Sequence, residues 1–370
     1  MKHNPENERM KHSYLTYLKE SESYSEATID AVATALDRFE THAKQRDFKK
    51  FHFEQAIAFK RYLVEQVSQR TGEKLSKSTT CSTLNDLRRF FIWLAREPGY
   101  RSKLRISDAN YFNPSKGDAQ VATARREKPV PTLEQITHVI YKMPATSDIE
   151  RRDRALLAFI AATGARDSAV ASLKLQHIDL VAGSVYQDAR QVKTKFRKTF
   201  TAFFFPVGDD ILNVVVGWVT YLRQEKLWGD DDPVFPSTHM TLGTSWRLEP
   251  SGLERKHWSS AAPIRKIFRQ AFAHAGLPYF NPHSFRHMLA RLGEKLTHSQ
   301  EEFKAWSENL GHDNVATTFG SYGTVGTQRR GEIIRGSAQT SSTPIANVRE
   351  LAKALAVALR STDSRGPLPR

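Results

Sequence analysis

The apolar run ALLAFIAA at residues 155–162 restricts the fold of this chain more than any other segment. A helix of this composition is apolar on every side, so it has to be buried inside a core. The run is far shorter than the ~20 apolar residues of a membrane span. Thr163 and Gly164 follow directly, and a glycine after a helical run is typical of a helix end. We therefore expect a globular domain that contains one buried helix ending at Gly164.

The charge of the chain is strongly positive. Its 55 Lys and Arg residues outnumber its 40 Asp and Glu residues, which gives a net charge of +15 and a pI near 9.8. Such an excess favours a polyanionic partner, and nucleic acid is the commonest one. The alternative is a basic soluble protein that has no such partner.

Composition also narrows the class of protein. Hydrophobic residues make up 39% of the chain, enough for packed cores, so extensive disorder is not expected. The single cysteine, Cys81, excludes an intramolecular disulfide and a cysteine-rich zinc site. The N-terminal sequence MKHNPENERMKHSY lacks the apolar segment of a signal peptide. We expect a soluble cytoplasmic protein.

The 370 residues favour two domains. Residues 1–112 are predicted to form short amphipathic helices with Lys and Arg between the apolar positions, a basic domain suited to the backbone of a duplex. Residues 113–131 show no periodicity and are predicted to be a linker. Residues 132–336 form the expected second domain. Residues 337–370 are a tail with a short helix, which would dock either on its own domain or on a neighbouring protomer.

Patterns within residues 132–336 predict mostly helices and a small sheet. Thr132 and Gln135 form a capping box at the start of the first helix. Residues 184–206 place β-branched and aromatic side chains around a polar, basic middle, which is typical of a hairpin. Residues 238–256 resemble a loop. Further helices are expected over residues 166–174, 211–226, 260–276, 284–296 and 299–310.

Residues 281–323 contain side chains suited to chemistry on a phosphate. His283 and Arg286 lie three apart on one predicted helix and so share a face. His312 follows a Leu-Gly pair, and Tyr322 lies ten residues further on, between glycines. A tyrosine in such a loop is most often a packed ring. As a nucleophile, a phenol with a pKa near 10 would need a base and nearby cations, which the two histidines and the arginine could supply.

Two further segments could complete such a site. Arg166, in TGAR directly after the buried helix, is a candidate for a second guanidinium fork on the phosphate. The basic run RQVKTKFRK at residues 190–198 offers a proton donor for the leaving oxygen, either Lys193 or Lys195. The alternative is a patch that only binds the DNA backbone.

A metal site is the weaker interpretation of the same region. His283 and His287 lie four apart, a spacing that can bind zinc. No glutamate lies between them as in a zinc protease, and no third ligand is evident. We therefore expect metal-independent chemistry.

Four segments, in this order, carry a family resemblance: TGARDSAVASLKLQHIDL, VKTKFRKTFTAFFFP, HSFRH and LGHDNVATTFGSYG. They resemble the catalytic domain of tyrosine recombinases, the phage-integrase family, over roughly residues 132–334. The N-terminal helical region is similar to the family's core-binding domain. The resemblance implies a mainly α fold with a small antiparallel β-sheet, arranged as a two-domain, C-shaped clamp on DNA.

The resemblance also implies roles for residues of this chain. Arg166 and Arg286 would hold the scissile phosphate, and His283 would handle a proton beside them. His312 would hydrogen-bond the phosphate. Lys193 would be the general acid toward the leaving 5′ oxygen.

The implied nucleophile is Tyr322, which would form a 3′-phosphotyrosine, and no cofactor is implied. Two positions depart from the family pattern. Ala169 stands three residues after Arg166, where an acidic residue is frequent, although Asp167 is adjacent. Tyr322 lies ten residues after His312, where nine are common, and Tyr279 is a distant alternative nucleophile.

The predicted function is that of a site-specific recombinase or integrase of a mobile element. Its partner would be double-stranded DNA with inverted-repeat sites, bound by a dimer at each site and a tetramer at synapsis. The alternatives are a type IB topoisomerase-like enzyme, a metal-dependent nuclease, and a DNA-binding protein with a decayed site. The sequence leaves open the DNA target, the accessory factors, and the choice between integration, excision, inversion and dimer resolution.

Overall fold

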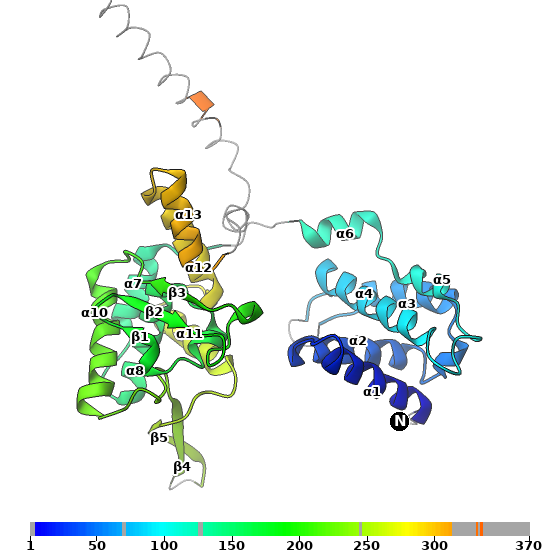
Figure 1. Ribbon diagram of the computed structural model, residues 1–370, viewed down its shortest axis with the longest axis horizontal. Coiled ribbons are helices and arrows are strands. Elements are labelled where there is room, and N and C mark those ends of the chain that lie inside the picture. The colour runs from blue at the N-terminus through cyan, green and yellow to red at the C-terminus, as the bar shows by residue number, and fades with distance from the viewer. Residues whose placement is uncertain are drawn as a thin grey trace, which may run out of the picture. The chain divides into compact units, whose positions relative to one another are not determined.

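Helices dominate the computed structural model, which describes residues 4–68, 72–124, 129–243, 246–312, 331, 334 and 335. The chain divides into two compact units, Met1–Arg125 and Arg126–Arg370 (Figure 1). Both units are mainly helical, and the second also contains two small antiparallel sheets. This confirms the predicted fold class. None of the helices in these ranges is long and apolar enough to span a membrane.

The first unit packs its helices around an aromatic core. The rings of Phe39, Phe59, Phe91 and Phe112 lie within 6.4 Å of one another, measured between centroids of the neighbouring pairs. Ser25 caps the second helix by accepting a hydrogen bond from the backbone N–H of Thr28, as its position predicts. The main helices are α1 (Pro5–Glu20), α2 (Glu26–His42), α3 (Phe53–Glu65) and α4 (Lys77–Leu94), followed by the short α5 (Ile106–Ala109).

Part of the segment predicted to be the linker, residues 113–131, is the helix α6 (Lys116–Thr123). Ser115 caps it by accepting from the N–H of Asp118, and Lys77 of α4 forms an ion pair with Asp118 at 2.6 Å. None of its residues is buried, so this helix has no apolar stripe that sequence periodicity could detect.

The second unit is built around α8 (Asp148–Thr163), the helix that contains the apolar run. Every residue from 155 to 162 is at most 1% exposed, which confirms the predicted buried helix. Gly164 ends it with φ +60°, and a Cβ there would lie 2.9 Å from the side chains of Leu289 and Leu310. The surrounding helices are α7 (Leu133–Lys142), α10 (Asp209–Thr220), α11 (Ala262–His274), α12 (Pro282–Leu296) and α13 (Gln300–Asn309). The predicted capping box of Thr132 and Gln135 is present at α7.

The three-stranded sheet lies in the order β1 (Ile178–Asp179), β2 (Ser184–Gln187), β3 (Phe200–Phe203), with both pairings antiparallel. The hairpin expected over residues 184–206 is therefore present. Residues 188–199 connect its two strands and include Lys193.

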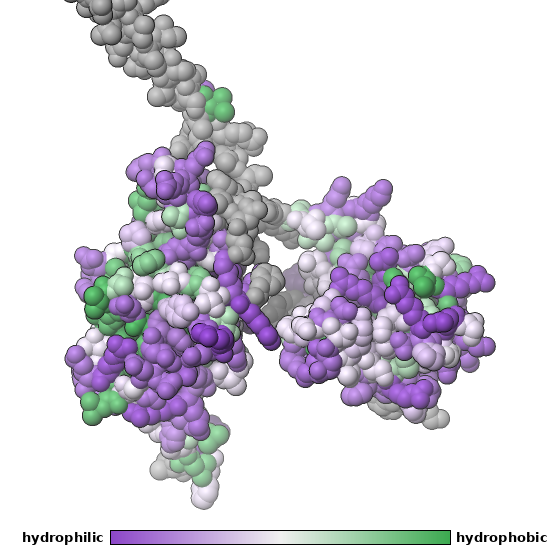
Figure 2. Space-filling view, viewed as in Figure 1, coloured by the Kyte–Doolittle hydropathy of each residue, from purple (hydrophilic) through white to green (hydrophobic). Residues whose placement is uncertain are grey.

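Two expectations about the second unit are wrong. The helix expected over residues 166–174 is a single turn, α9 (Asp167–Val170). Residues 238–256, expected to be a loop, lie largely in a second hairpin of β4 (Ser237–Leu242) and β5 (Leu248–Glu254). These strands are solvated on both faces and contain Pro250 and a bulge at His239/Met240, so they lack the alternation that marks a half-buried strand. Figure 2 shows apolar side chains on this exposed hairpin.

Candidate active site

Arg286 lies at the centre of the candidate site and is 5% exposed. Asn281 caps α12 through the backbone N–H of Ser284, which starts the helix so that Arg286 points into the unit. One terminal nitrogen of Arg286 donates to the Gly164 carbonyl at the left-handed end of α8, and the other donates to the Leu310 carbonyl after α13. Its Nε–H is buried and has no hydrogen-bond partner in the described part of the chain.

His312 completes a pair with this arginine. Its Nε2 lies 3.2 Å from a terminal nitrogen of Arg286. An arginine only donates hydrogen bonds, so Nε2 accepts and the proton of the neutral ring is on Nδ1. Burial, followed by the positive charges of Arg286 and Arg166, lowers the pKa of His312 to about 4. The imidazole is therefore neutral at physiological pH.

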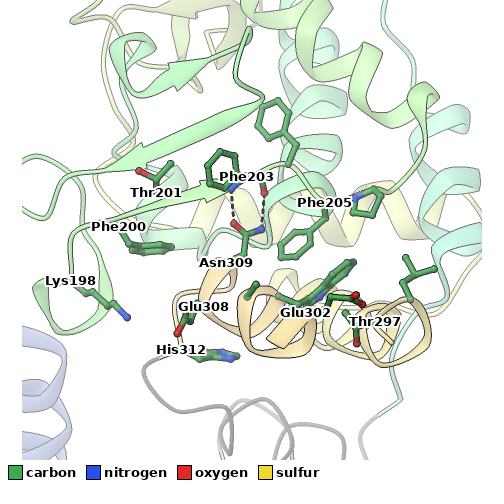
Figure 3. A pocket seen from close by; sticks show the side chains of 15 residues that line it. Lys198, Phe200, Thr201, Phe203, Phe205, Thr297, Glu302, Glu308, Asn309 and His312 are labelled. Atoms are coloured by element: carbon green, nitrogen blue, oxygen red, sulfur yellow. Dashed lines mark hydrogen bonds between the residues drawn. The ribbon is translucent and has the colours of Figure 1, made fainter. Parts of the chain in front are cut away.

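The end of α13 is attached to the sheet through Asn309 (Figure 3). The side-chain oxygen of Asn309 accepts from the Phe203 N–H at 2.6 Å, and its nitrogen donates to the Phe203 carbonyl at 2.9 Å. Gly311 follows with φ +71°, where a Cβ would lie 2.8 Å from the Phe200 ring. These contacts determine where the backbone reaches His312.

Arg166 is the second guanidinium of the site. It stands at the N-cap position of α9, two residues after Gly164, and is partly buried. Burial lowers its pKa. Burial, together with the positive charge of Arg166, lowers the pKa of Arg286 to about 9, which leaves the Arg286 guanidinium charged at pH 7. Within the described residues no carboxylate pairs with either arginine, and the site is therefore suited to an anion.

The carboxylates nearest in sequence do not support Arg166. Asp167 forms an ion pair with Arg265 of α11 at 2.8 Å, with the two side chains 23% and 60% exposed. Ala169, at the position where the family often has an acid, is buried. In the described part of the chain, no neighbouring carboxylate therefore replaces the acidic residue that the family often has three positions after the first arginine.

The remaining candidate residues lie in different surroundings. His283 is on α12 but is exposed, with its ring 4.8 Å from that of His287, so sharing a helix with Arg286 does not give it the same burial. In its protonated form His283 contributes to the lowered pKa of His312. Lys193 and Lys195 are both exposed on the β2–β3 connection. Tyr322 lies outside the described residues.

Tyr279, the alternative nucleophile, precedes α12. Its side chain is 42% exposed, and the guanidinium carbon of Arg269 lies 5.3 Å from the ring centroid. This is an ordinary cation–π contact at the surface.

Sequence reasoning did not single out two residues that belong to this region. Lys198 contributes to the lowered pKa of His312 and lines, with His312 and Phe200, a groove between β3 and α13. The sequence did contain a pattern that could have identified Lys198, because this residue lies within the basic run at residues 190–198. Asn309 carried no signal, because its partner Phe203 is 106 residues away.

The described residues include no group of three His, Cys, Asp or Glu side chains placed to hold a metal ion. The His283–His287 pair accordingly has no third ligand in that part of the chain.

A mainly helical domain that holds two arginines and a neutral imidazole, with no paired carboxylate among the residues that the structure describes, has the features of an enzyme that acts on phosphate esters. Two sequence models of protein families match this chain. The one described as Phage integrase family matches residues 132–329, and the one described as Phage integrase, N-terminal SAM-like domain matches residues 12–98. The chain belongs to the phage integrase family, the tyrosine recombinases.

Relatives and solved structures agree with this family. The tyrosine recombinase XerC of Halalkalibacterium halodurans is 24% identical over 317 residues, which cover 85% of this chain and 92% of the relative. XerC of Escherichia coli O157:H7 is 25% identical, with 82% and 88% covered. A lambda integrase dimer bound to a core site has the same fold, with a TM-score of 0.55 at 14% identity over 86% of this chain and 96% of that one.

A structure of the XerH recombinase bound to its substrate before cleavage gives a TM-score of 0.51 at 16% identity, over 88% of this chain and 83% of that one. At these identities the similarity establishes the fold.

Proposed function

We propose that this protein is a site-specific recombinase that cleaves and rejoins DNA strands through a 3′-phosphotyrosine formed by Tyr322. The observation that carries the proposal is the environment of Arg286. Its guanidinium is buried, is held by two backbone carbonyls, and lies near the charge of Arg166 with no carboxylate among the described residues. A buried positive charge without a counter-ion favours an anionic ligand, and a DNA phosphate is the anion on which the family acts.

The proposed reaction uses each group at a stated atom. The phenol oxygen of Tyr322 attacks the phosphorus, and His283 takes the phenol proton. Arg166 and Arg286 stabilise the charge on the non-bridging oxygens, with His312 hydrogen-bonded beside them. The bond from phosphorus to the 5′ oxygen breaks, and Lys193 gives that oxygen a proton. Attack by another 5′ hydroxyl on the phosphotyrosine reverses these steps and rejoins the DNA without a cofactor.

The proposed partner is double-stranded DNA with inverted-repeat sites. The N-terminal SAM-like unit would bind the duplex together with the catalytic unit, as one dimer per site and a tetramer at synapsis, in the cytoplasm. Support comes from the net charge of +15 and from related folds solved as a DNA-bound dimer and as a tetramer on a Holliday junction.

The test traps the covalent intermediate. Duplexes recovered from a randomised pool by binding to the full chain would be nicked near the cleavage position, so that the leaving strand diffuses away. Wild-type protein should form a covalent protein–DNA adduct, and Tyr322→Phe should form none, while Tyr279→Phe should behave as wild type.

Three outcomes would contradict the proposal. An undiminished adduct in Tyr322→Phe would exclude this nucleophile. Binding without an adduct on any duplex would indicate a decayed site. Relaxation of supercoils by a monomer without site preference would indicate a topoisomerase.

A further inference from the structure

Two serines hydrogen-bond the two backbone polar groups of Lys193. The Ser172 hydroxyl oxygen accepts a hydrogen bond from the Lys193 N–H at 2.9 Å. The Ser168 hydroxyl donates to the Lys193 carbonyl at 3.3 Å. The backbone N–H and the carbonyl of Lys193 therefore both bond to serine side chains of a single segment, which lies more than twenty residues away in sequence.

The Ser172 hydroxyl is oriented for this role. The serine is 8% exposed, and its own hydrogen is directed into the turn, where the carbonyls of Ala169 at 3.0 Å and Ser168 at 3.3 Å accept it. Because the hydrogen is used within the turn, a lone pair of the oxygen faces the Lys193 N–H. The residue before Lys193, Val192, is 2% exposed within the core, and its N–H donates to the Asp188 carbonyl at 2.7 Å.

The anchoring segment is the one that begins at Arg166. Ser168 lies within α9, and Ser172 is the second residue after that helix. The lysine side chain is exposed, and in the described part of the chain no carboxylate pairs with its ammonium group. What locates this ammonium relative to Arg166 is therefore its backbone attachment and not a side-chain partner.

We propose that Ser172, assisted by Ser168, is a positioning residue for Lys193. The two serines would hold the β2–β3 connection at a defined place against the turn that begins at Arg166. The inference rests on the proposed function, in which Arg166 holds the phosphate and Lys193 protonates the leaving oxygen of the same phosphate. The two groups have to act within about 3 Å of one reacting centre, so a small shift of the connection misplaces the proton donor.

The test uses the proton requirement of the leaving group. In an ordinary substrate the electron pair of the breaking bond leaves on the 5′ oxygen, which takes a proton from the ammonium of Lys193. In a duplex with a 5′-bridging sulfur at the scissile position, the pair leaves as a thiolate. A thiol has a pKa of ~8.5, so this departure needs no general acid at pH 8.

Single-turnover adduct formation by the full chain would be measured on both duplexes. Lys193→Ala should slow the oxygen substrate by about 10²-fold or more and leave the sulfur substrate close to wild type. Ser172→Ala should slow the oxygen substrate by about tenfold, with the same recovery on sulfur. Ser168→Ala, which loses the longer bond, should show a smaller effect of the same kind.

Matched controls separate positioning from folding. Ser184→Ala in β2 removes an equally buried hydroxyl, also 8% exposed, that does not contact Lys193, and it should leave both substrates unchanged. In a Lys193→Ala background, Ser172→Ala should cause no further loss on the oxygen substrate, because a residue that acts only through Lys193 has nothing left to position.

Different results overturn different statements. Equal slowing of both substrates by Ser172→Ala, or an additive loss in the double variant, would make Ser172 a purely structural residue. Wild-type rates in both Ser172→Ala and Ser168→Ala would exclude the positioning role while leaving the proposed function intact. Absence of any adduct with the wild-type chain would instead reject the proposed function. If Ser172→Ala does not fold, Ser168→Ala decides the question by its ratio of oxygen to sulfur rates.

Discussion

The two halves of the candidate site are held in place by different means. Arg286 is enclosed in the second unit, with its terminal nitrogens on the carbonyls of Gly164 and Leu310. Lys193 is exposed and attached through hydrogen bonds of its backbone to Ser168 and Ser172. The half proposed to bind the phosphate is thus built into packed structure, whereas the half proposed to donate the proton depends on a surface connection. Catalytic variants of the first half should also affect stability, and those of the second half should not.

The largest expected effect comes from the buried arginine. Arg286→Ala leaves the Gly164 and Leu310 carbonyls without their donor and removes the charge proposed to bind the phosphate. Adduct formation should fall by about 10³-fold, measured in single turnover on the selected duplexes. Arg286→Lys keeps a charge but cannot reach both carbonyls with one ammonium, so it should recover only a small part of the rate. A rate within a factor of a few of wild type in Arg286→Ala would contradict the central role of this residue.

A backbone change should test how strongly packing holds the first half. Gly164→Ala introduces a Cβ at φ +60° that meets Leu289 and Leu310 at 2.9 Å. Strain and overpacking should together reduce the free energy of unfolding by about 3 kcal/mol, measured by chemical denaturation.

Gly183→Ala is the matched control. Its φ is +59°, but the nearest atom lies 3.8 Å from the added Cβ. Only the strain of a left-handed backbone then reduces the free energy of unfolding, by about 1 kcal/mol. Equal losses in the two variants would mean that packing around Gly164 contributes nothing.

Acid should weaken the first half through His312. Its pKa is about 4 in the folded chain and ~6.5 when unfolded, so the unfolded state takes up the proton first. Stability from the neutral ring is therefore fully present above about pH 6.5 and is lost as the pH falls toward 4. His312→Gln should flatten the dependence of Tm on pH in this window. If the dependence of Tm on pH is the same in His312→Gln as in the wild type, the lowered pKa of His312 does not contribute to acid sensitivity.

The smallest effect is expected where the sheet meets α13. Asn309→Ala removes the two hydrogen bonds to Phe203 and should reduce the free energy of unfolding by about 1 kcal/mol. The amide hydrogen of Phe203 should also exchange faster with solvent. Asn309→Asp keeps an acceptor for that amide but places a carboxylate oxygen against the Phe203 carbonyl, so amide protection should persist in part. Unchanged exchange in Asn309→Ala would show that the sheet does not need this contact.

Sequence patterns were successful where the information is local. The apolar run at residues 155–162, the capping box at Thr132 and the hairpin that carries Lys193 depend on neighbours a few residues away. The helix α6 and the β4–β5 hairpin were missed, because their residues are solvated and show no apolar period. The shortness of α9 was missed because its composition does not differ from that of a longer helix.

The sequence by itself determined the family, the mainly helical fold and the set of candidate residues, since these follow from composition, spacing and the order of four segments. The tertiary structure alone decided that Arg286 is buried while His283 on the same helix is exposed. It also decided that His312 is neutral and that Ser172 holds Lys193. The physical reason is that burial and hydrogen bonding at these residues come from partners 21 to 122 positions away, and such contacts exist only after the helices have packed.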